Sequence, residues 1–283
     1  MTTDGLVIVD KPAGMTSHDV VGRCRRIFGQ KKVGHAGTLD PDATGVLLVG
    51  LGRATRLMQY MSGLGKTYTT EIVLGTATST LDDSGEVTGS WDMSGVTLEQ
   101  AAAAAGRLTG AIDQVPPMVS AVKFAGKRLH QLAREGIEVE RAARRVVVDR
   151  FELGWAAPGV LSAVIECSSG TYVRVLADDL GRLLGGGAHV RRLRRTAVGP
   201  WRESDATPLD EVGPAQVLVP VEALPWLEAV RVDGEAEAAV RFGRPLSGGD
   251  LGAHGPGPWR VVGADGALLA VYEADRRVVL AGG

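Results

Sequence analysis

The sequence predicts a mixed α/β protein in two domains, of which the second is small and mainly β. Short strand-like runs alternate with helical segments over residues 1–212, whereas residues 213–283 carry strand-like runs and one helix. At about 150 residues per domain, 283 residues allow one large domain or two smaller ones. The hydrophobic content of 45% and charged content of 23% are those of an ordinary globular protein that can bury its own core.

Six apolar runs predict the strands of the first domain. Each run is short, and turn-forming residues separate it from its neighbours. The runs cover residues 5–10, 46–49, 66–75, 146–153, 160–167 and 190–198. The last run is unusual because it also carries four arginines.

Apolar residues at three- and four-residue spacing predict helices between these strands. The first helix begins at Thr16 or Ser17, either of which can cap its N-terminus. The others cover residues 53–61, 97–108 and 171–184. Three remaining segments are expected to be loops, residues 31–45, 76–89 and 123–145. The last of them is expected to contain one short helix over residues 129–135.

The second domain follows a linker-like stretch that four prolines interrupt after Trp201. Beyond this stretch, one helix is expected, and Gly243 is expected to end it. The expected elements are a strand at 230–232, the helix at 235–242, and strands at 259–262, 267–272 and 277–281.

Charge is unevenly distributed along the chain. The net charge of −2 alone argues against a nucleic-acid partner. However, residues 15–66 have a net charge of +5 and residues 118–202 a net charge of +7, with an acidic segment of −6 between them. Arginine outnumbers lysine 25 to 6, which suits phosphate recognition, although a GC-rich genome gives the same bias.

Several classes of protein are excluded. The two cysteines, Cys24 and Cys167, are too few for a disulfide framework, and the five histidines lack metal-ligand spacing. No apolar run reaches about 18 residues, and the N-terminus lacks a signal-peptide pattern. We therefore expect a cytoplasmic protein without a metal, a cofactor or a membrane partner. The expected oligomeric state is a monomer, which these counts do not decide.

The densest group of chemically capable residues lies in the Gly-rich stretch 32–46. Pro41 holds Asp40 away from helical geometry, so its carboxylate is presented from a rigid turn, with His35 nearby in the sequence. The alternative is an ordinary Asx turn and a packed histidine. Arg174, at the start of a predicted helix, could keep a carboxylate ionised, or could be a surface arginine.

Two nucleotide-binding motifs are suggested and rejected. The sequence Gly-Lys-Thr at 65–67 looks like the end of a P-loop, but Tyr60 stands where the first glycine is needed. The stretch 46–55 has two of the three glycines of a dinucleotide fingerprint, and Thr55 replaces the third. No nucleotide cofactor is expected.

Six motifs occur in series between residues 10 and 195. They are DKPAGMTS at 10–17, HAGTLDPDATG at 35–45, KTY at 66–68, TSTLDDSG at 78–85, SGTYVR at 169–174 and GAHVRRLRR at 187–195. In order and spacing they resemble the TruB family, the bacterial tRNA pseudouridine(55) synthases. The chain past about residue 213 resembles a short PUA-type RNA-binding unit.

The resemblance implies both a fold and a reaction. The fold is a pseudouridine synthase fold with a largely antiparallel central sheet over residues 1–212, an RNA-binding insertion at about 118–145, and a PUA-like domain at 213–283. The reaction isomerises the uridine at position 55 in the T-stem-loop of tRNA. The glycosidic bond breaks, the uracil turns over, and a carbon–carbon bond forms through C5, with no metal required.

The resemblance also assigns roles to individual residues. Asp40 is the nucleophile, attacking either ribose C1′ or uracil C6, and Arg174 keeps it ionised. Tyr68, which taken alone is more typical of a strand core, stacks on the target ring and could also assist proton removal at C5. Tyr172 supports the Asp40–Arg174 pair. His35 fills the stack that the flipped base vacates. Contacts to RNA or to the flipped base are expected from Lys11, Asp82 and Leu193.

Two other functions use parts of the same pattern. A noncatalytic tRNA-binding or tRNA-folding protein could share the scaffold, but the intact set of Asp40, Tyr68 and Arg174 argues against it. A nucleotide-dependent oxidoreductase would use Gly50 and Gly52, and a cofactor titration would detect it.

Overall fold

The computed structural model describes residues 2–118, 120, 123–124, 127–128, 137, 139–273 and 277–280. They form two compact units. The first comprises residues 1–41, 46–62 and 200–283, and the second comprises residues 42–45 and 63–199. The short helix expected over residues 129–135 lies outside the described residues.

The N-terminal part of the first unit is built on β1 (Gly5–Lys11), which pairs in parallel with β14 (Thr207–Pro208). A hairpin-like pair follows, with β2 (Val33–Ala36) antiparallel to β3 (Thr44–Leu51). Strand β2 was not expected, because glycine and histidine interrupt its short apolar pattern.

Helix α1 (Ser17–Ile27) begins at Thr16, as the sequence predicts. Thr16 and Asp19 form a reciprocal capping box, which satisfies N–H groups at the start of the helix. The single helix expected at 53–61 is instead a 3₁₀ turn, η1 (Gly52–Leu57), followed by α2 (Met58–Ser62). The Thr55 hydroxyl donates to the Gly52 carbonyl (2.8 Å), and this local bond favours the tighter turn.

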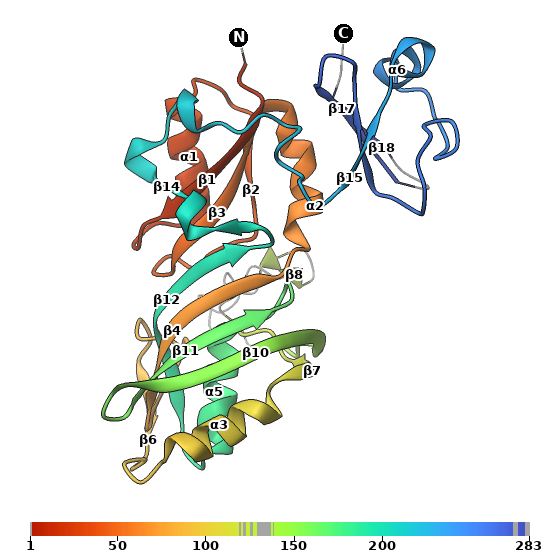
Figure 1. The fold of residues 1–283 in the computed structure, drawn as a ribbon. Coiled ribbons are helices and arrows are strands. Elements are labelled where there is room, and N and C mark those ends of the chain that lie inside the picture. Colours follow the sequence, from red (N-terminus) through yellow and green to blue (C-terminus); the bar gives the residue numbers. More distant parts are fainter. Residues whose placement is uncertain are drawn as a thin grey trace. The chain divides into compact units, whose positions relative to one another are not determined.

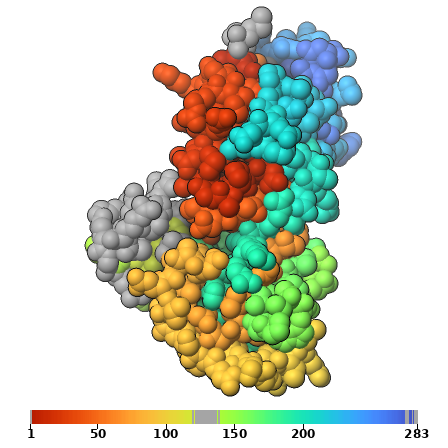
Figure 2. Space-filling model, turned by 90° about the vertical axis from the view of Figure 1, so that its left-hand side faces the viewer, coloured from red at the N-terminus to blue at the C-terminus, as the bar shows by residue number. Residues whose placement is uncertain are grey.

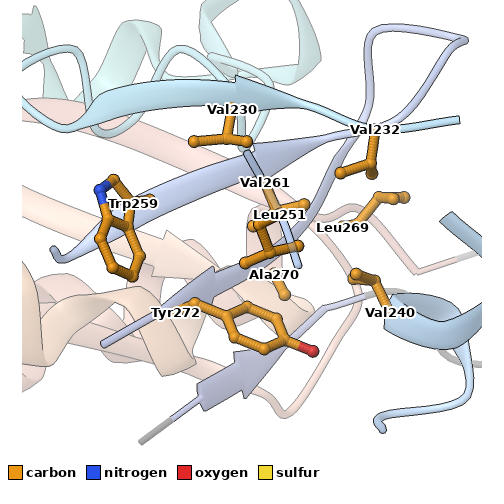
Figure 3. Packing of buried hydrophobic residues seen from close by; sticks show 9 residues of the cluster. All are labelled: Val230, Val232, Val240, Leu251, Trp259, Val261, Leu269, Ala270 and Tyr272. Atoms are coloured by element: carbon orange, nitrogen blue, oxygen red, sulfur yellow. The ribbon is translucent and has the colours of Figure 1, made fainter. Parts of the chain in front are cut away.

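The C-terminal part of the first unit is a four-stranded sheet with its own core (Figure 3). Strand β15 (Glu228–Arg231) is parallel to β16 (Trp259–Val262), and β17 (Leu268–Tyr272) and β18 (Arg277–Val279) continue the sheet antiparallel. Helix α6 (Gly234–Arg241) contributes Val240 to the core. The small, mainly β unit that the sequence predicts is confirmed.

The second unit is built on five antiparallel strands in the order β12–β4–β11–β10–β7 (Figure 1). Their bounds are Lys66–Leu74 for β4, Gly110–Gln114 for β7, Arg144–Ala157 for β10, Val160–Cys167 for β11 and Ala188–Val198 for β12. Successive residues of β4 alternate between buried and half-buried, as expected of a strand in a sheet. The expected largely antiparallel sheet is therefore confirmed.

Helices and short strands complete the second unit. Helix α5 (Val173–Leu183) packs on β12, and α3 (Leu98–Arg107) packs on β10. The α3 segment, yellow in Figure 2, lies at the surface. Part of the loop expected at 76–89 forms a strand pair, and the insertion contributes two short paired strands. These strands are β5 (Thr76–Thr78), β6 (Val87–Ser90), β8 (Lys123–Phe124) and β9 (Lys127–Arg128).

No helix among the described residues is long and apolar enough to cross a membrane.

The first two residues of β3 belong to the second unit, where Thr44 and Gly45 pair in parallel with Arg194 and Arg195 of β12. Gly45 has φ +102°, and a Cβ atom at this position would overlap the carbonyl oxygen of Arg195. Only glycine therefore permits this close approach of two backbones.

Gly45→Ala is expected to lower the free energy of unfolding by about 3 kcal/mol, because the added methyl meets backbone atoms that cannot rotate away. Gly106→Ala is the control, since Gly106 lies exposed in α3 with open space around it. That change should stabilise the protein by roughly 0.5–1 kcal/mol. Urea denaturation measures both, and an unaltered stability for Gly45→Ala would contradict the packing argument.

Candidate functional site

Asp40 lies in a turn of the first unit whose two neighbouring residues are both fixed. The backbone N–H of Leu39 donates to the Ser17 hydroxyl (2.9 Å), and both residues are buried. On the other side, the carbonyl of Pro41 accepts a hydrogen bond from the ammonium of Lys11 (2.8 Å). Asp40 itself is half-buried. The turn thus presents a carboxylate from a backbone that has little freedom to move.

Lys11 is completely buried, with 0% of its surface exposed. Its ammonium also donates to the carbonyls of Pro12 (2.8 Å) and Met15 (2.5 Å). Three N–H donors thus meet three carbonyl acceptors within the protein. The buried ammonium thus holds the Asp40 turn, and the expected contact between Lys11 and RNA stays a prediction.

His35 lies in β2 and is half-buried. Its ring meets the ring of His18 edge to face, with centroids 5.6 Å apart and an interplanar angle of 82°. His18 is exposed on α1, so the pair forms an aromatic feature at the surface of the first unit.

In the second unit, Arg174 lies in the first turn of α5 and is only 4% exposed. Its Nη1 donates to the carbonyl of Thr80 (2.8 Å) and to the carboxylate of Asp82 (3.2 Å). The structure thus brings together two of the expected site residues, Arg174 and Asp82. A buried guanidinium held in this way has a fixed direction.

The Asp82 carboxylate is engaged within the protein on both of its oxygens. Oδ1 accepts hydrogen bonds from the hydroxyls of Thr80 and Ser84, each at 2.6 Å, and Oδ2 accepts from Arg174. The intervening Leu81 has φ +64°, which is rare for a residue with a side chain. Asp82 therefore organises a tight turn that faces Arg174.

Tyr172 is half-buried and immediately precedes α5. The buried side chain of Gln114, at the end of β7, binds both polar groups of its backbone. Tyr172 N–H donates to Gln114 Oε1 (2.9 Å), and Gln114 Nε2 donates to the Tyr172 carbonyl (3.3 Å). Sequence reasoning missed Gln114, although its position directly before Val-Pro-Pro marks the end of a strand.

Tyr68 lies in β4 between Ile165 of β11 and Arg195 of β12, and it is 8% exposed. Lys66 lies two residues away on the same buried face of β4 and donates to the carbonyl of Leu64 (2.7 Å). Burial is the main cause that lowers the pKa of Lys66 to about 8, and the charge of Arg195 adds to it. The ammonium of Lys66, on the same face of β4 as Tyr68, thus loses part of its hydration on folding.

Leu193 is half-buried and follows Arg192 in an irregular part of β12. It is the one expected site residue on this strand.

The expected site residues form two groups, each within one unit. Lys11, His35 and Asp40 lie in the first, and Tyr68, Asp82, Tyr172, Arg174 and Leu193 lie in the second. The Asp40–Arg174 pair stays a prediction.

Two family models match the chain. The model described as TruB family pseudouridylate synthase (N terminal domain) matches residues 25–173. The model described as tRNA pseudouridylate synthase B C-terminal domain matches residues 174–224. Together they include every motif that the sequence analysis singled out except the first.

Similarity to individual proteins supports the same family. The chain is 48% identical over 280 residues to the tRNA pseudouridine synthase B of Mycobacterium sp. (strain KMS), covering 95% of this chain and 92% of that protein. It is 55% identical over 216 residues to the protein of that name from Mycolicibacterium paratuberculosis (strain ATCC BAA-968 / K-10), covering 75% and 74%. A chain in the crystal structure of a Cbf5-Nop10-Gar1 complex superposes with a TM-score of 0.72 at 27% identity, covering 95% of this chain and 78% of that one.

The lowered pKa of Lys66 predicts a pH dependence of stability. Between pH 8 and 10.5 the unfolded chain keeps a proton that the folded chain has lost, so this group's contribution to stability rises with pH. Relative to Lys66→Met, the parent protein should gain up to about 3 kcal/mol across this range. Cys24 and Cys167, with pKa values raised to about 11 by burial, are present in both proteins, so their effects should largely cancel. Urea titrations at pH 7.5 to 10.5 measure the difference, and a constant difference would mean that Lys66 titrates normally.

Proposed function

The chain belongs to the TruB family of pseudouridylate synthases, and from this membership we propose that it isomerises uridine to pseudouridine in tRNA. Its relatives from Mycobacterium and Mycolicibacterium carry the name tRNA pseudouridine synthase B. The observation in this chain that carries the proposal is the Asp40 turn, in which a carboxylate is flanked by two residues whose backbones are fixed.

Asp40 is the proposed nucleophile. An ionised carboxylate can attack ribose C1′ or uracil C6, and both routes end in the same product. The bond between N1 and C1′ breaks, a bond between C5 and C1′ forms, C5 loses its proton, and N1 gains one, so no oxidant or reductant is consumed. The fixed turn contributes because a nucleophile that is already oriented loses less entropy when it reacts.

Tyr68 and Arg174 are proposed to act beside Asp40. Tyr68 offers an aromatic face for stacking on the target ring, and Arg174 supplies a buried positive charge whose direction Asp82 and Thr80 set. Lys11 and Asp82 are proposed to contact the RNA near the site, with Asp82 also orienting Arg174. Tyr172 is proposed to support the Asp40–Arg174 pair. Leu193 is proposed to pack against the flipped base.

The substrate is proposed to be the T-stem-loop of tRNA, with the uridine at position 55 flipped out of its stack. The basic segments 15–66 and 118–202 supply the charge for phosphate contacts. Residues 1–212 are proposed to form the catalytic domain, with the insertion at about 118–145 contacting RNA, and residues 213–283 a PUA-like RNA-binding domain. The protein is proposed to act as a cytoplasmic monomer.

The direct test is incubation with an unmodified tRNA transcript, followed by mapping of pseudouridine at single-nucleotide resolution. Modification at one T-loop uridine is the expected result. Tight binding without modification would instead favour a noncatalytic tRNA-folding role.

Asp40→Asn is expected to abolish isomerisation while tRNA affinity stays within about tenfold of the parent, because only the nucleophile is lost. Tritium release from C5-labelled uridine measures the rate, and filter binding measures the affinity.

Asp42→Asn is the matched control, since Asp42 carries the same group two residues away, exposed to solvent, and has no assigned role. Turnover of Asp40→Asn near the parent rate would remove Asp40 from its proposed role.

His35→Ala is expected to slow the reaction on folded tRNA by roughly tenfold more than on a short T-loop fragment. The reason is that the fragment needs less unstacking, so it needs less help from a side chain that fills the vacated stack. Single-turnover rates on the two substrates measure the effect. Asp40→Asn should be equally inactive on both, and an equal loss on both for His35→Ala would show that His35 supports the site in another way.

A further inference from the structure

Strand β12 contains a bulge just before the part of the strand that faces Tyr68. Arg191 pairs with Glu71 of β4, but the next paired residue, Arg194, lies opposite Thr69. Three steps along β12 therefore correspond to two steps along β4, which leaves one extra residue in β12 between these pairs. Arg192 and Leu193 occupy this bulge.

The bulge changes which side chains reach each face of the sheet. Side chains alternate between faces along a strand, so one extra residue moves the next paired side chains, Arg194 and Arg195, to the opposite face, up to a second register shift between Arg195 and Ala197. With the bulge, Arg195 lies opposite both Tyr68 and Gly45. Without it, Arg194 would take the place opposite Tyr68. The bulge thus sets both the position of Leu193 and the register of the strand beside Tyr68.

Arg192 adopts a backbone conformation that a residue with a side chain rarely takes. Its φ is +55°, in the left-handed region. Glycine reaches this region without steric penalty, whereas arginine needs surrounding contacts to hold it there. The bulge therefore depends on interactions outside the strand's own hydrogen-bond ladder.

The carboxylate of Glu71 supplies such interactions on both of its oxygens. Oε2 accepts from Arg191 at 2.6 Å (Nη2) and 2.7 Å (Nε), and Oε1 accepts from Arg192 Nη1 at 2.7 Å. Hydrogen bonds and charge from the two guanidinium groups hold the pKa of Glu71 below its ordinary value, so it stays ionised at neutral pH. Next to it, the buried Thr70 hydroxyl donates to the Arg191 carbonyl (2.9 Å).

This arrangement differs from an ordinary surface ion pair. The side chain of Glu71 is 19% exposed, and its two oxygens bind two consecutive residues, Arg191 just before the bulge and Arg192 within it. By contrast, Glu166 of the same sheet is 43% exposed and pairs with one arginine, Arg150 (2.7 Å), beside a register shift in β10, a strand that carries none of the expected site residues. Exposed pairs of the second kind contribute little to structure.

We propose that Glu71 is a positioning residue of this enzyme, which clamps the β12 bulge through Arg191 and Arg192 and thereby aims Leu193 at the flipped base. The inference rests on the proposed function, because it takes Leu193 to pack against that base. Glu71 itself touches neither the substrate nor the reacting atoms.

The test compares Glu71→Ala with the control Glu166→Ala, which removes a carboxylate of the same sheet that pairs with one arginine. At saturating enzyme, Glu71→Ala should lower the single-turnover rate on tRNA about tenfold or more, with the dissociation constant within about threefold of the parent. Glu166→Ala should react at the parent rate. A rate for Glu71→Ala equal to that of the control would overturn the proposal.

A double-mutant cycle tests whether Glu71 acts through Leu193. If it does, adding Glu71→Ala to Leu193→Ala should cause little further loss of rate. Full additivity of the two losses would overturn the proposal.

A rescue experiment separates positioning from a general loss of folding. Arg192→Gly allows φ near +55° without a clamp, so adding it to Glu71→Ala should recover most of the lost rate. No recovery, with thermal melting equal to that of the parent, would count against the clamp. Failure of the parent protein itself to form pseudouridine would refute the proposed function instead, so the two failures are distinguishable.

Discussion

The buried ammonium of Lys11 is the contact on which the geometry of the Asp40 turn depends. Removing a charged amine from water is costly, and the cost is offset only if all its donors find acceptors. Here the carbonyls of Pro12, Met15 and Pro41 provide them. The Lys11 ammonium connects the end of β1 to Pro41, which is 30 residues away in the sequence. The hydrogen bond between Ser17 and Leu39 makes a second connection between the same two segments. Lys11 and Ser17 of the motif at 10–17 thus hold the backbone of the motif at 35–45.

The second unit uses the same principle with different groups. Gln114 binds the backbone that precedes α5, and Asp82 fixes the direction of Arg174. Glu71 binds Arg192 in the bulge that also contains Leu193. Each of these side chains acts on a residue far away in the sequence. Polar groups that are buried with all partners in place add orientation more than net stability. Such fixed groups supply the preorganisation that the proposed reaction would require.

Much of the fold follows from local sequence pattern. The six predicted strands of the first domain, the Thr16 cap and the C-terminal β unit were predictable, because period-two and period-3.6 patterns and capping residues are local signals. Strand β2 and the β5–β6 pair were not, because their glycine- and threonine-rich sequences are also typical of loops. The motifs predicted Asp40, Tyr68 and Arg174 as site residues. They could not show that Lys11 is buried, because one of its carbonyl acceptors, Pro41, lies 30 residues away in the sequence.

Backbone strain in the second unit occurs next to two of the expected site residues, Asp82 and Leu193. Among the described residues, Leu81 and Arg192 are the two with side chains and positive φ. Leu81 immediately precedes Asp82, whose carboxylate binds Thr80, Ser84 and Arg174. Arg192 immediately precedes Leu193 and is bound by Glu71. A disfavoured conformation persists only where nearby contacts enforce it, and in both places a carboxylate with both oxygens engaged does so. The strained positions thus lie next to the carboxylate contacts of Arg174 and Arg192, which is where the proposed site for a flipped base would need its backbone held most firmly.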